Sequence, residues 1–383
     1  MTPAHPRWPR APAQPALICG GLAERMKFSA LIVFMSAWSL LVYSPVAHSV
    51  WFTDGNVNSS RNGWMTFGRL YRKTLPSGDI YYAGILDFAG GAVVHINSGV
   101  AALVSAIMLG KRHGLGKIPM EPHNLSISLI GASLLWVGWF GFNAGSVLGS
   151  GDNAGYTMAV TQIATGAAGL SWMFTEWLVK GKPSVLSIIS GAVAGLVVIT
   201  PACGYVDMTG SMLMGCIGGI VCFFAVQVKH KLGYDDALDG FGVHGVGGML
   251  GAFLTGFFAS PDVAAASGAD FTGVFYIKRY LQLQTIQIAG ALEGTYSGVM
   301  FQGNKMAGAT QLGMQCIGIS AVAGYSAFMT WLLLFIIDKI MGIRIDLQSE
   351  VEGLDSSVHG EKVYYGGEHE AGSIGDRPGM EVI

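Results

Sequence analysis

Charged residues divide this chain into long apolar intervals. Eight charge-free stretches of at least 21 residues separate them, namely 28–53, 88–110, 122–151, 153–175, 183–206, 208–228, 240–261 and 306–337. A helix needs roughly 20 mostly apolar residues to cross the ~30 Å hydrocarbon core of a bilayer. The pattern therefore predicts an all-α polytopic membrane protein with about eight full transmembrane helices. Two shorter intervals, 11–23 and 280–292, have 13 residues each and are too short to cross alone.

The composition agrees with residence in a membrane. Of 383 residues, 51% are hydrophobic and 12% are charged, whereas a soluble domain carries about 25% charged residues. The 56 glycines suit helices that pack closely in lipid. A net charge of -2 provides no basic surface for nucleic acid. All the cysteines lie in apolar stretches, which indicates packing rather than disulfides; they are Cys19, Cys203, Cys216, Cys222 and Cys316.

The short loops alternate in charge, which predicts an orientation. Basic residues precede the first span and follow the second, fourth and sixth, whereas loops 147–156 and 203–209 contain no Lys or Arg. The basic loops and the C-terminal tail are therefore expected on the cytoplasmic side. The long connections, 54–83 and 262–305, then lie outside. The basic residues are Arg25, Lys27, Lys111, Arg112, Lys117, Lys180, Lys182, Lys229 and Lys231.

A polar pattern, Asp-x7-His-x3-Gly, occurs twice in the apolar sequence. The two copies are Asp87, His95 and Gly99, and Asp236, His244 and Gly248. The predicted topology inserts the first copy from the outside and the second from the inside. Eight residues of helix rise about 12 Å, so both histidines should lie near the middle of the membrane. Inverted repeats with a site at the midplane are a known plan of transporters.

Each polar residue of the repeat has alternative interpretations. A single intramembrane histidine is as often a satisfied interhelical hydrogen bond as a functional group, but two in an inverted repeat favour a paired, pore-lining role. A metal site is not favoured, because no Cys, Asp or Glu stands at ligand spacing around either histidine inside the membrane. Asp236 and Asp239 are expected to cap a helix, whereas capping and cation attraction are compatible roles for Asp87.

Several motifs resemble the ammonium transporter family, the Amt, Mep and Rhesus proteins. The stretch DFAGGAVVHINSGVAALVSAIMLGKR, from Asp87 to Arg112, is similar to the family signature over its whole length. Further matches are GGLAERMKFSA (20–30), PVAHSVW (45–51), PHNLS (122–126), GWFGFNAGS (138–146), GKPS (181–184), TPACGY (200–205), FGVHGVGG (241–248) and EGLDSSVHGE (352–361). The resemblance is collinear from about residue 15 to about residue 365.

The resemblance implies an outer cation site. Trp51 matches the aromatic residue that receives ammonium at the outer mouth, and Ser146 matches the hydroxyl that accepts a hydrogen bond from it. Phe142 matches one of two stacked rings that gate the pore, and Asp87 matches the buried carboxylate that supports the site. Taken without the family, Trp51 could be an interfacial belt residue and Ser146 an ordinary loop residue.

The resemblance also implies a pore lined by His95, His244 and Trp139, which match the twin histidines and a wall aromatic of the family. Ammonium has four N–H donors, so an indole face offers cation–π attraction and a hydroxyl offers an acceptor. An intact charge is costly to move through hydrocarbon, so deprotonation at the mouth and passage of neutral ammonia lower the barrier. The histidines then offer hydrogen bonds and a separate route for the proton.

The chain departs from the family at its start. Family members have eleven transmembrane helices; here helices one and two have no counterpart, and about residues 15–23 represent the third. The second gate phenylalanine would fall near Arg10, in a proline-rich segment, 1–14, that does not resemble the family. We therefore expect an N-terminally truncated, incomplete form that conducts poorly. The predicted divisions are this segment, a transporter domain over 15–340 and a cytoplasmic tail over 341–383.

The leading hypothesis is a homotrimeric ammonium channel or transporter of the cell membrane, without enzyme activity or cofactor. The resemblance implies contact between its cytoplasmic face and a P-II type regulatory protein. The alternative is an ammonium sensor or regulatory subunit that binds without transport and signals through the charged tail. A water or glycerol channel is a third candidate, but the sequence contains no pair of Asn-Pro-Ala motifs. Passive ammonia conduction and electrogenic transport are not distinguished at this stage.

Overall fold

A computed structural model describes residues 14–53, 59–66, 70–74, 80–120, 122–260, 263 and 305–361. All eight predicted stretches are helical in this part of the chain. The helices before the first long loop are α1 (Gln14–Leu22), α2 (Phe28–Trp38), η1 (Ser39–Tyr43) and α3 (Ser44–Trp51). Those after it are η2 (Gly91–Ile96), α4 (Asn97–Leu109), α5 (Leu125–Ala144), η3 (Gly145–Val147), α6 (Asp152–Lys180), α7 (Val185–Ile199), α8 (Met208–Leu232), η4 (Phe241–Gly245), α9 (Val246–Phe258), α11 (Lys305–Met341), α12 (Leu347–Glu352) and η6 (Asp355–His359).

Six helical spans in the described residues are long and apolar enough to cross a membrane. They are Phe28–Trp51, Gly91–Leu109, Leu125–Val147, Met208–Leu232, Phe241–Phe258 and Ala309–Met341. The predicted stretch 183–206 forms α7, an apolar helix of 15 residues that gives way to a turn. The stretch 153–175 lies within the 29-residue α6, which buries Thr157, Thr161 and Thr165 inside the protein. The predicted all-α multi-pass fold is therefore confirmed.

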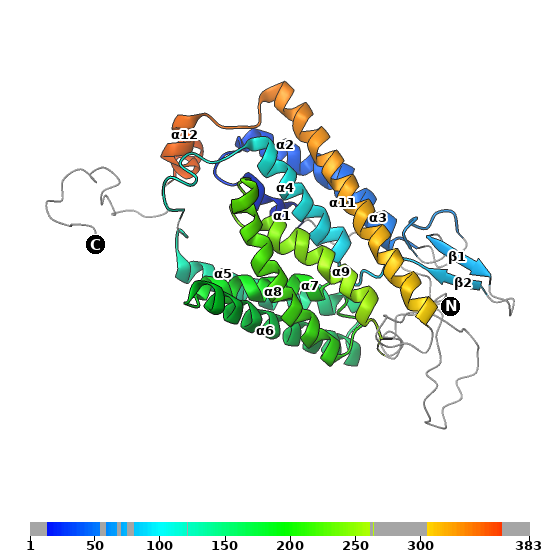
Figure 1. The fold of residues 1–383 in the computed structure, drawn as a ribbon. Coiled ribbons are helices and arrows are strands. Elements are labelled where there is room, and N and C mark those ends of the chain that lie inside the picture. Colours follow the sequence, from blue (N-terminus) through cyan, green and yellow to red (C-terminus); the bar gives the residue numbers. More distant parts are fainter. Residues whose placement is uncertain are drawn as a thin grey trace.

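The helices gather in two groups that meet at α9. In one group α6 packs against α7 and α8, and in the other α4 packs against α1 and α11. The helix α9 contacts α7, α8 and α11, and so joins the two groups. Figure 1 shows α5 to α8 together on one side and α11 running along the opposite edge, beside α2 and α3. The short helices that carry the two histidines, η2 and η4, lie where these groups meet.

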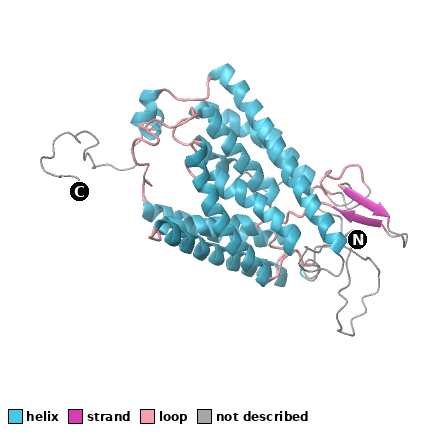
Figure 2. Cartoon of the chain, in the orientation of Figure 1, coloured by secondary structure: helices cyan, strands magenta, loops and turns pink. Residues whose placement is uncertain are grey.

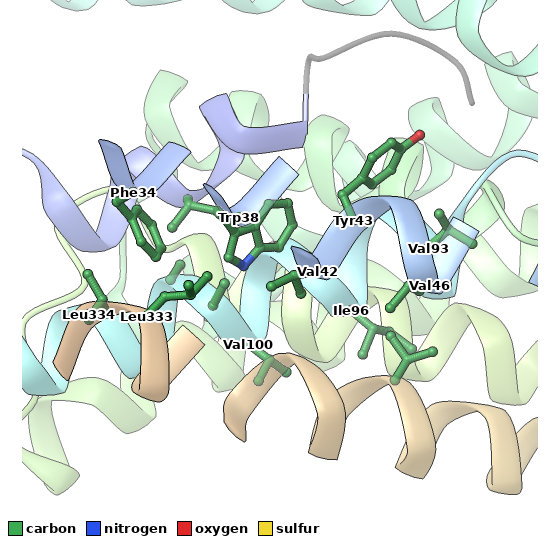
Figure 3. Packing of buried hydrophobic residues seen from close by; sticks show 14 of the residues in the cluster. Phe34, Trp38, Val42, Tyr43, Val46, Val93, Ile96, Val100, Leu333 and Leu334 are labelled. Carbon is green, nitrogen blue, oxygen red and sulfur yellow. The ribbon is translucent and has the colours of Figure 1, made fainter. Parts of the chain in front are cut away.

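A buried apolar cluster holds the first span to α4 and α11. Figure 3 shows Phe34, Trp38, Val42 and Val46 of the first span facing Ile96, Val100, Leu333 and Leu334. Lipid is as apolar as these side chains, so close packing and buried hydrogen bonds stabilise this contact more than exclusion of water does. Trp38 supplies such a bond, because its Nε1 donates to Thr330 Oγ1 at 3.1 Å.

A proline in the first span is compensated from a distant helix. Pro45 has no N–H, so it cannot donate to the carbonyl of Leu41 one turn earlier. The hydroxyl of Tyr325, in α11, donates to Leu41 O at 2.7 Å and satisfies that carbonyl. The π-helical segment η1 ends just before this proline. The span therefore continues through Pro45 with the Leu41 carbonyl paired, which suits a bilayer.

The long connection after Trp51 contains a small hairpin that the charge and hydrophobic pattern does not predict. Strands β1 (Tyr71–Thr74) and β2 (Ile80–Ala83) pair antiparallel, with Tyr71 opposite Ala83 and Thr74 opposite Ile80. Figure 2 shows these strands at one end of the helical bundle. The predictions for Arg10 and for 280–292 lie outside the described residues.

At the end of the bundle where the basic loops lie, charged side chains from distant parts of the sequence form a network of ion pairs. Arg25 is fully buried and its Nη1 lies 2.6 Å from Asp235 Oδ2. Arg112 binds the same carboxylate through Nε at 2.9 Å and also contacts Glu24 at 2.6 Å. Burial alone would raise the pKa of Asp235, but hydrogen bonds from Arg112 and the charges of both arginines outweigh it, so this pKa lies below its usual value.

The segment after α11 is tied to the same region by its backbone. Lys27 N donates to Ile343 O at 2.9 Å, and Ile345 N donates to Arg25 O at 3.0 Å. The guanidinium of Arg344 donates to Leu109 O at the end of α4 and to Glu350 in α12. The start of the predicted C-terminal tail is thus part of the folded structure.

Candidate functional site

The two histidines of the repeat meet at the crossing of their helices. The distance between His95 Nδ1 and His244 Nδ1 is 3.2 Å, and the rings stack with centroids 5.3 Å apart at 22°. His95 is 1% exposed, and its buried Nε2 has no hydrogen-bond partner among the residues that the structure describes. The structure therefore brings together two residues that are 149 positions apart in the sequence.

Glycines allow this close crossing. A Cβ added to Gly99 would lie 2.1 Å from Gly245 N, and one added to Gly248 would lie 2.9 Å from Gly91 O. Both distances are too short for any side chain, so the backbones of the two helices are in direct contact beside the histidines. Each histidine also belongs to a π-helical segment, η2 or η4, a local widening of the helix that is frequent at functional sites.

Aromatic rings cover the first histidine. Trp139, near the end of α5, stacks on His95 with centroids 5.2 Å apart at 12°. The ring of Phe142 lies edge-on to both, with its centroid 6.2 Å from that of His95 and 5.7 Å from that of Trp139. The indole is oriented by Thr200, whose Oγ1 accepts from Trp139 Nε1 at 2.9 Å. The predicted wall aromatic and gate ring are thus in contact with one of the two predicted pore histidines.

Asp87 lies at the start of η2 and caps it. Its two carboxylate oxygens accept hydrogen bonds from the backbone N–H groups of Gly90, Gly91, Ala92 and Val93, at 2.5 to 3.0 Å. Burial raises the pKa of this carboxyl, and the four donors act against that rise. A protonated carboxyl has too few acceptor sites for all four donors, so the geometry suits the ionised form.

The other two residues of the predicted outer site contact members of the same set. Trp51 ends α3, and its Nε1 donates to Asp87 O at 2.8 Å. Ser146 lies in η3, and its hydroxyl donates to Phe142 O at 2.8 Å. That bond orients the Ser146 oxygen as an acceptor. Gly90 has a φ of +126°, and a Cβ there would lie 2.5 Å from Val94 Cγ2. Both the backbone conformation and this close contact favour glycine at this position.

The second copy of the repeat is capped differently. Asp236 Oδ2 accepts from Phe241 N at 2.7 Å, at the start of η4. Asp239 has a positive φ of 57°, and its carboxylate pairs with Lys229 Nζ at 2.5 Å instead of binding a helix end. Both residues therefore have structural contacts, but only Asp87 binds four amides.

Polar residues behind the site were not selected from the sequence. Thr200 joins Trp139 to Asn143, at 3.4 Å from its Oδ1, and Asn143 Nδ2 donates to Thr161 at 3.1 Å. The signal that could have found them is the one that found the histidines, namely a buried polar side chain in an apolar helix. In the part of the chain that the structure describes, no three His, Cys, Asp or Glu side chains gather as metal ligands do.

Fold and site together define a class of protein. A multi-pass helical bundle with a carboxylate cap at one end and a buried histidine pair walled by aromatics is typical of membrane transporters and channels. Residues 10–364 match the sequence model of the Ammonium Transporter Family, and the chain belongs to this family.

Individual relatives support this membership. An "Ammonium transporter" of Aquifex aeolicus is 43% identical over 350 residues, which cover 91% of this chain and 68% of the relative. The crystal structure of Candida albicans Mep2 aligns with a TM-score of 0.70 at 35% identity, covering 88% of this chain and 64% of that one. A structure named "Sensor Amt Protein" has a TM-score of 0.68 at 24% identity, covers 90% of this chain and 73% of its own, and shares the fold. The chain spans about two-thirds of the length of these relatives.

Proposed function

We propose that this protein moves ammonium nitrogen across a membrane, receiving ammonium at an outer site and passing ammonia along the histidine pair. The observation that carries the proposal is the 3.2 Å contact between the two Nδ1 atoms, beside a buried His95 Nε2 and under the Trp139 ring. A membrane interior retains such polar groups where a polar molecule or proton passes.

The Nδ1 contact constrains the protons of the pair. Two neutral imidazoles can share this hydrogen bond only if one Nδ1 carries a hydrogen and the other offers its lone pair. The ring that accepts must then carry its own hydrogen on Nε2. One Nε2 of the pair is consequently a donor and the other an acceptor. A neutral molecule such as ammonia, which both donates and accepts, suits this arrangement.

The proposed outer site supplies the groups that a cation needs. Trp51 offers an indole face, and its orientation is fixed by the bond to Asp87 O. The carboxylate of the same Asp87 accepts hydrogen bonds from four backbone N–H groups. Ser146 and Phe142 are the proposed acceptor and gate ring. Ammonium would be held there and give up its proton to the separate route along the histidines, and the nitrogen would continue as ammonia, which avoids moving the intact cation through hydrocarbon.

Uptake of radiolabelled methylammonium tests the proposal. The chain is expressed in cells that lack their own ammonium transporters, and His95→Asn and His244→Asn are compared with wild type. Each substitution should lower the maximal uptake rate by about tenfold or more, because a barrier increase of about 1.4 kcal/mol costs a factor of ten. The matched control is His230→Asn, at the exposed end of α8, which should leave uptake unchanged.

The outcomes separate the hypotheses. Uptake that survives both pair substitutions would contradict the pore role of the histidines. Saturable binding of ammonium by the purified protein, with no uptake by the same chain, would favour the sensor. Membrane abundance is measured by immunoblot in every case, so that loss of protein is not read as loss of transport.

The finer assignments belong to the same proposal. We place the basic loops and residues 341–361 on the cytoplasmic face of the cell membrane, from the charge alternation of the short loops. We also propose a homotrimer, with a P-II type protein as a partner on that face. Mass measurement of the protein in lipid nanodiscs tests the trimer, and co-purification with a P-II protein tests the partner.

A further inference from the structure

The entry segment, residues 84–89, runs without helix or strand from the hairpin to the first histidine helix. It carries Asp87 and ends just before Gly90. Its residues 84–87 and 89 are buried, so their backbone polar groups need partners that regular structure does not provide. Two backbone carbonyls outside the segment supply part of what is needed. Phe88 N donates to Pro201 O at 3.0 Å, and Ala89 N donates to Thr200 O at 3.2 Å.

Ile85 N donates to Met65 O at 3.0 Å, and two glutamines of α11 supply the partners of Leu86 and of Gly84 O. Leu86 N donates to Gln315 Oε1 at 2.6 Å, and Gln315 Nε2 donates back to Leu86 O at 2.9 Å. The same Nε2 donates to Ala252 O, in α9, at 2.8 Å. Gln311 Nε2 donates to Gly84 O at 2.9 Å and to Gln315 Oε1 at 3.3 Å.

The orientation of the Gln315 amide is fixed by these partners. A backbone N–H can only donate and a carbonyl can only accept, so Oε1 must face Leu86 N while Nε2 faces Leu86 O and Ala252 O. Both hydrogens of Nε2 and both lone pairs of Oε1 are then in use. Gln315 is completely buried, and a shorter side chain would not span the three backbone groups.

We propose that Gln315 is a positioning residue for the outer cation site, an inference that rests on the transport function proposed above. It acts through Leu86, the residue immediately before Asp87. By holding both backbone groups of Leu86, Gln315 fixes where the next peptide lies, and therefore where Asp87 O accepts the Trp51 indole and where the carboxylate caps η2. Its bond to Ala252 O ties this segment to α9, which continues the helix that carries His244.

Close packing supports the same role. A Cβ added to Gly318 would lie 2.2 Å from Ile85 Cδ1, and one added to Gly256 would lie 2.9 Å from Gln315 Cγ. The segment, α9 and α11 are thus in direct contact around Gln315. Loss of its amide would leave Leu86 N, Leu86 O and Ala252 O without these partners in a buried place, and the segment would have to shift to recover them.

The test compares three variants with wild type in methylammonium uptake. Gln315→Met keeps the length of the side chain and removes all four bonds. We expect its half-saturating concentration to rise about three- to tenfold, the factor that loss of one or two net hydrogen bonds gives, while the maximal rate changes less than about twofold, since the pore is intact. Gln162→Met, the same change at an exposed position in α6, is the matched control and should alter neither.

A conservative variant, Gln315→Glu, adds a rescue. The carboxyl that this change introduces is buried, so it stays neutral and provides one O–H donor and one acceptor. Gln315→Glu should therefore fall between wild type and Gln315→Met in half-saturating concentration. If Gln315→Met does not reach the membrane, the half-saturating concentration of Gln315→Glu is compared with that of the control Gln162→Glu. Equal half-saturating concentrations in the Gln315 variants and wild type, or a fall in maximal rate alone, would overturn the proposal.

Hydrogen exchange separates this inference from the proposed function. The exchange is measured by mass spectrometry on the protein in nanodiscs. The backbone amides of residues 86–93 should exchange faster in Gln315→Met or Gln315→Glu than in wild type, and those of residues 100–109 should exchange equally. If the wild-type chain takes up no methylammonium, the transport proposal fails, and unchanged exchange at residues 86–93 is then the result that overturns the positioning role.

Discussion

Gly99→Ala is the most direct test of the helix crossing that brings the histidines together. The added methyl group would lie 2.1 Å from Gly245 N and 2.9 Å from the carbonyl carbon of His244. Ordinary contact begins at 3.4 Å, so the two backbones must separate by about 1.3 Å to admit it. The histidine Nδ1 atoms are already 3.2 Å apart. A shift of this size therefore lengthens their contact beyond hydrogen-bonding distance.

The energetic cost follows from overpacking at a rigid crossing. Inserting one methyl group into a well-packed interior costs about 1–3 kcal/mol, and alanine recovers about 1 kcal/mol through its higher helix propensity. The net effect on stability should be a modest fall in Tm. The effect on transport should be larger, because the histidine contact depends directly on the separation of the helices.

A matched control isolates that effect. A Cβ added to Gly138, in α5, meets nothing within 4 Å, so Gly138→Ala makes the same chemical change without the clash. Thermal unfolding in detergent and methylammonium uptake are measured for both variants. We expect Gly138→Ala to match or exceed wild type in Tm and to retain uptake. Gly99→Ala should show a modest fall in Tm and a larger loss of uptake. Equal uptake by the two variants would refute the reasoning that the crossing sets the histidine contact.

Three further results are expected. Asp87→Asn turns an NH2 group toward backbone donors, which should cost about 1–3 kcal/mol for each donor left unpaired, and an unchanged Tm would contradict the cap. Trp139→Phe removes the bond to Thr200 but keeps a ring beside His95, so uptake should fall while the fold persists; full uptake would show that the indole N–H is dispensable. Because the pKa of Asp235 is lowered in the folded protein, its stabilisation is complete above the unfolded-state value of about 3.9 and is lost as the pH falls through the folded value. Asp235→Asn should flatten that acid-side fall in Tm, and parallel curves would argue against the pair.

The positions of the helices could be predicted from the sequence because the bilayer excludes charge. The interval 28–53 became the continuous span Phe28–Trp51, and 240–261 became Phe241–Phe258. The rule was less accurate where a charge is compensated. The helix α6 extends past 175 to Lys180, because Glu176 is buried among the partners Lys180 and Ser184 and can remain in the helix.

The histidine pair could be anticipated, whereas its detailed geometry could not. The repeated spacing placed His95 and His244 at similar depth, and the structure shows them in contact. The π-helical turns that present them leave no mark on hydrophobic periodicity. Gln311 and Gln315, in contrast, are visible in the sequence. Two glutamines four residues apart on one face of an apolar helix are costly unless they are paired. Their partners in the segment before the first histidine helix, Gly84 and Leu86, are more than 200 positions away and cannot be found without the fold.

Because the two imidazoles share one hydrogen, the tautomers of the pair depend on the last proton that passed. A proton that enters at one Nε2 and leaves from the other moves the central hydrogen across the 3.2 Å gap, so the ring that donated now accepts. A second proton cannot follow in the same direction until both rings have returned to their first tautomers. In the proposed mechanism ammonia needs no such exchange, so it would pass repeatedly while the pair keeps one state. The proton and the nitrogen would then have different reset steps, even though both would use the same two side chains.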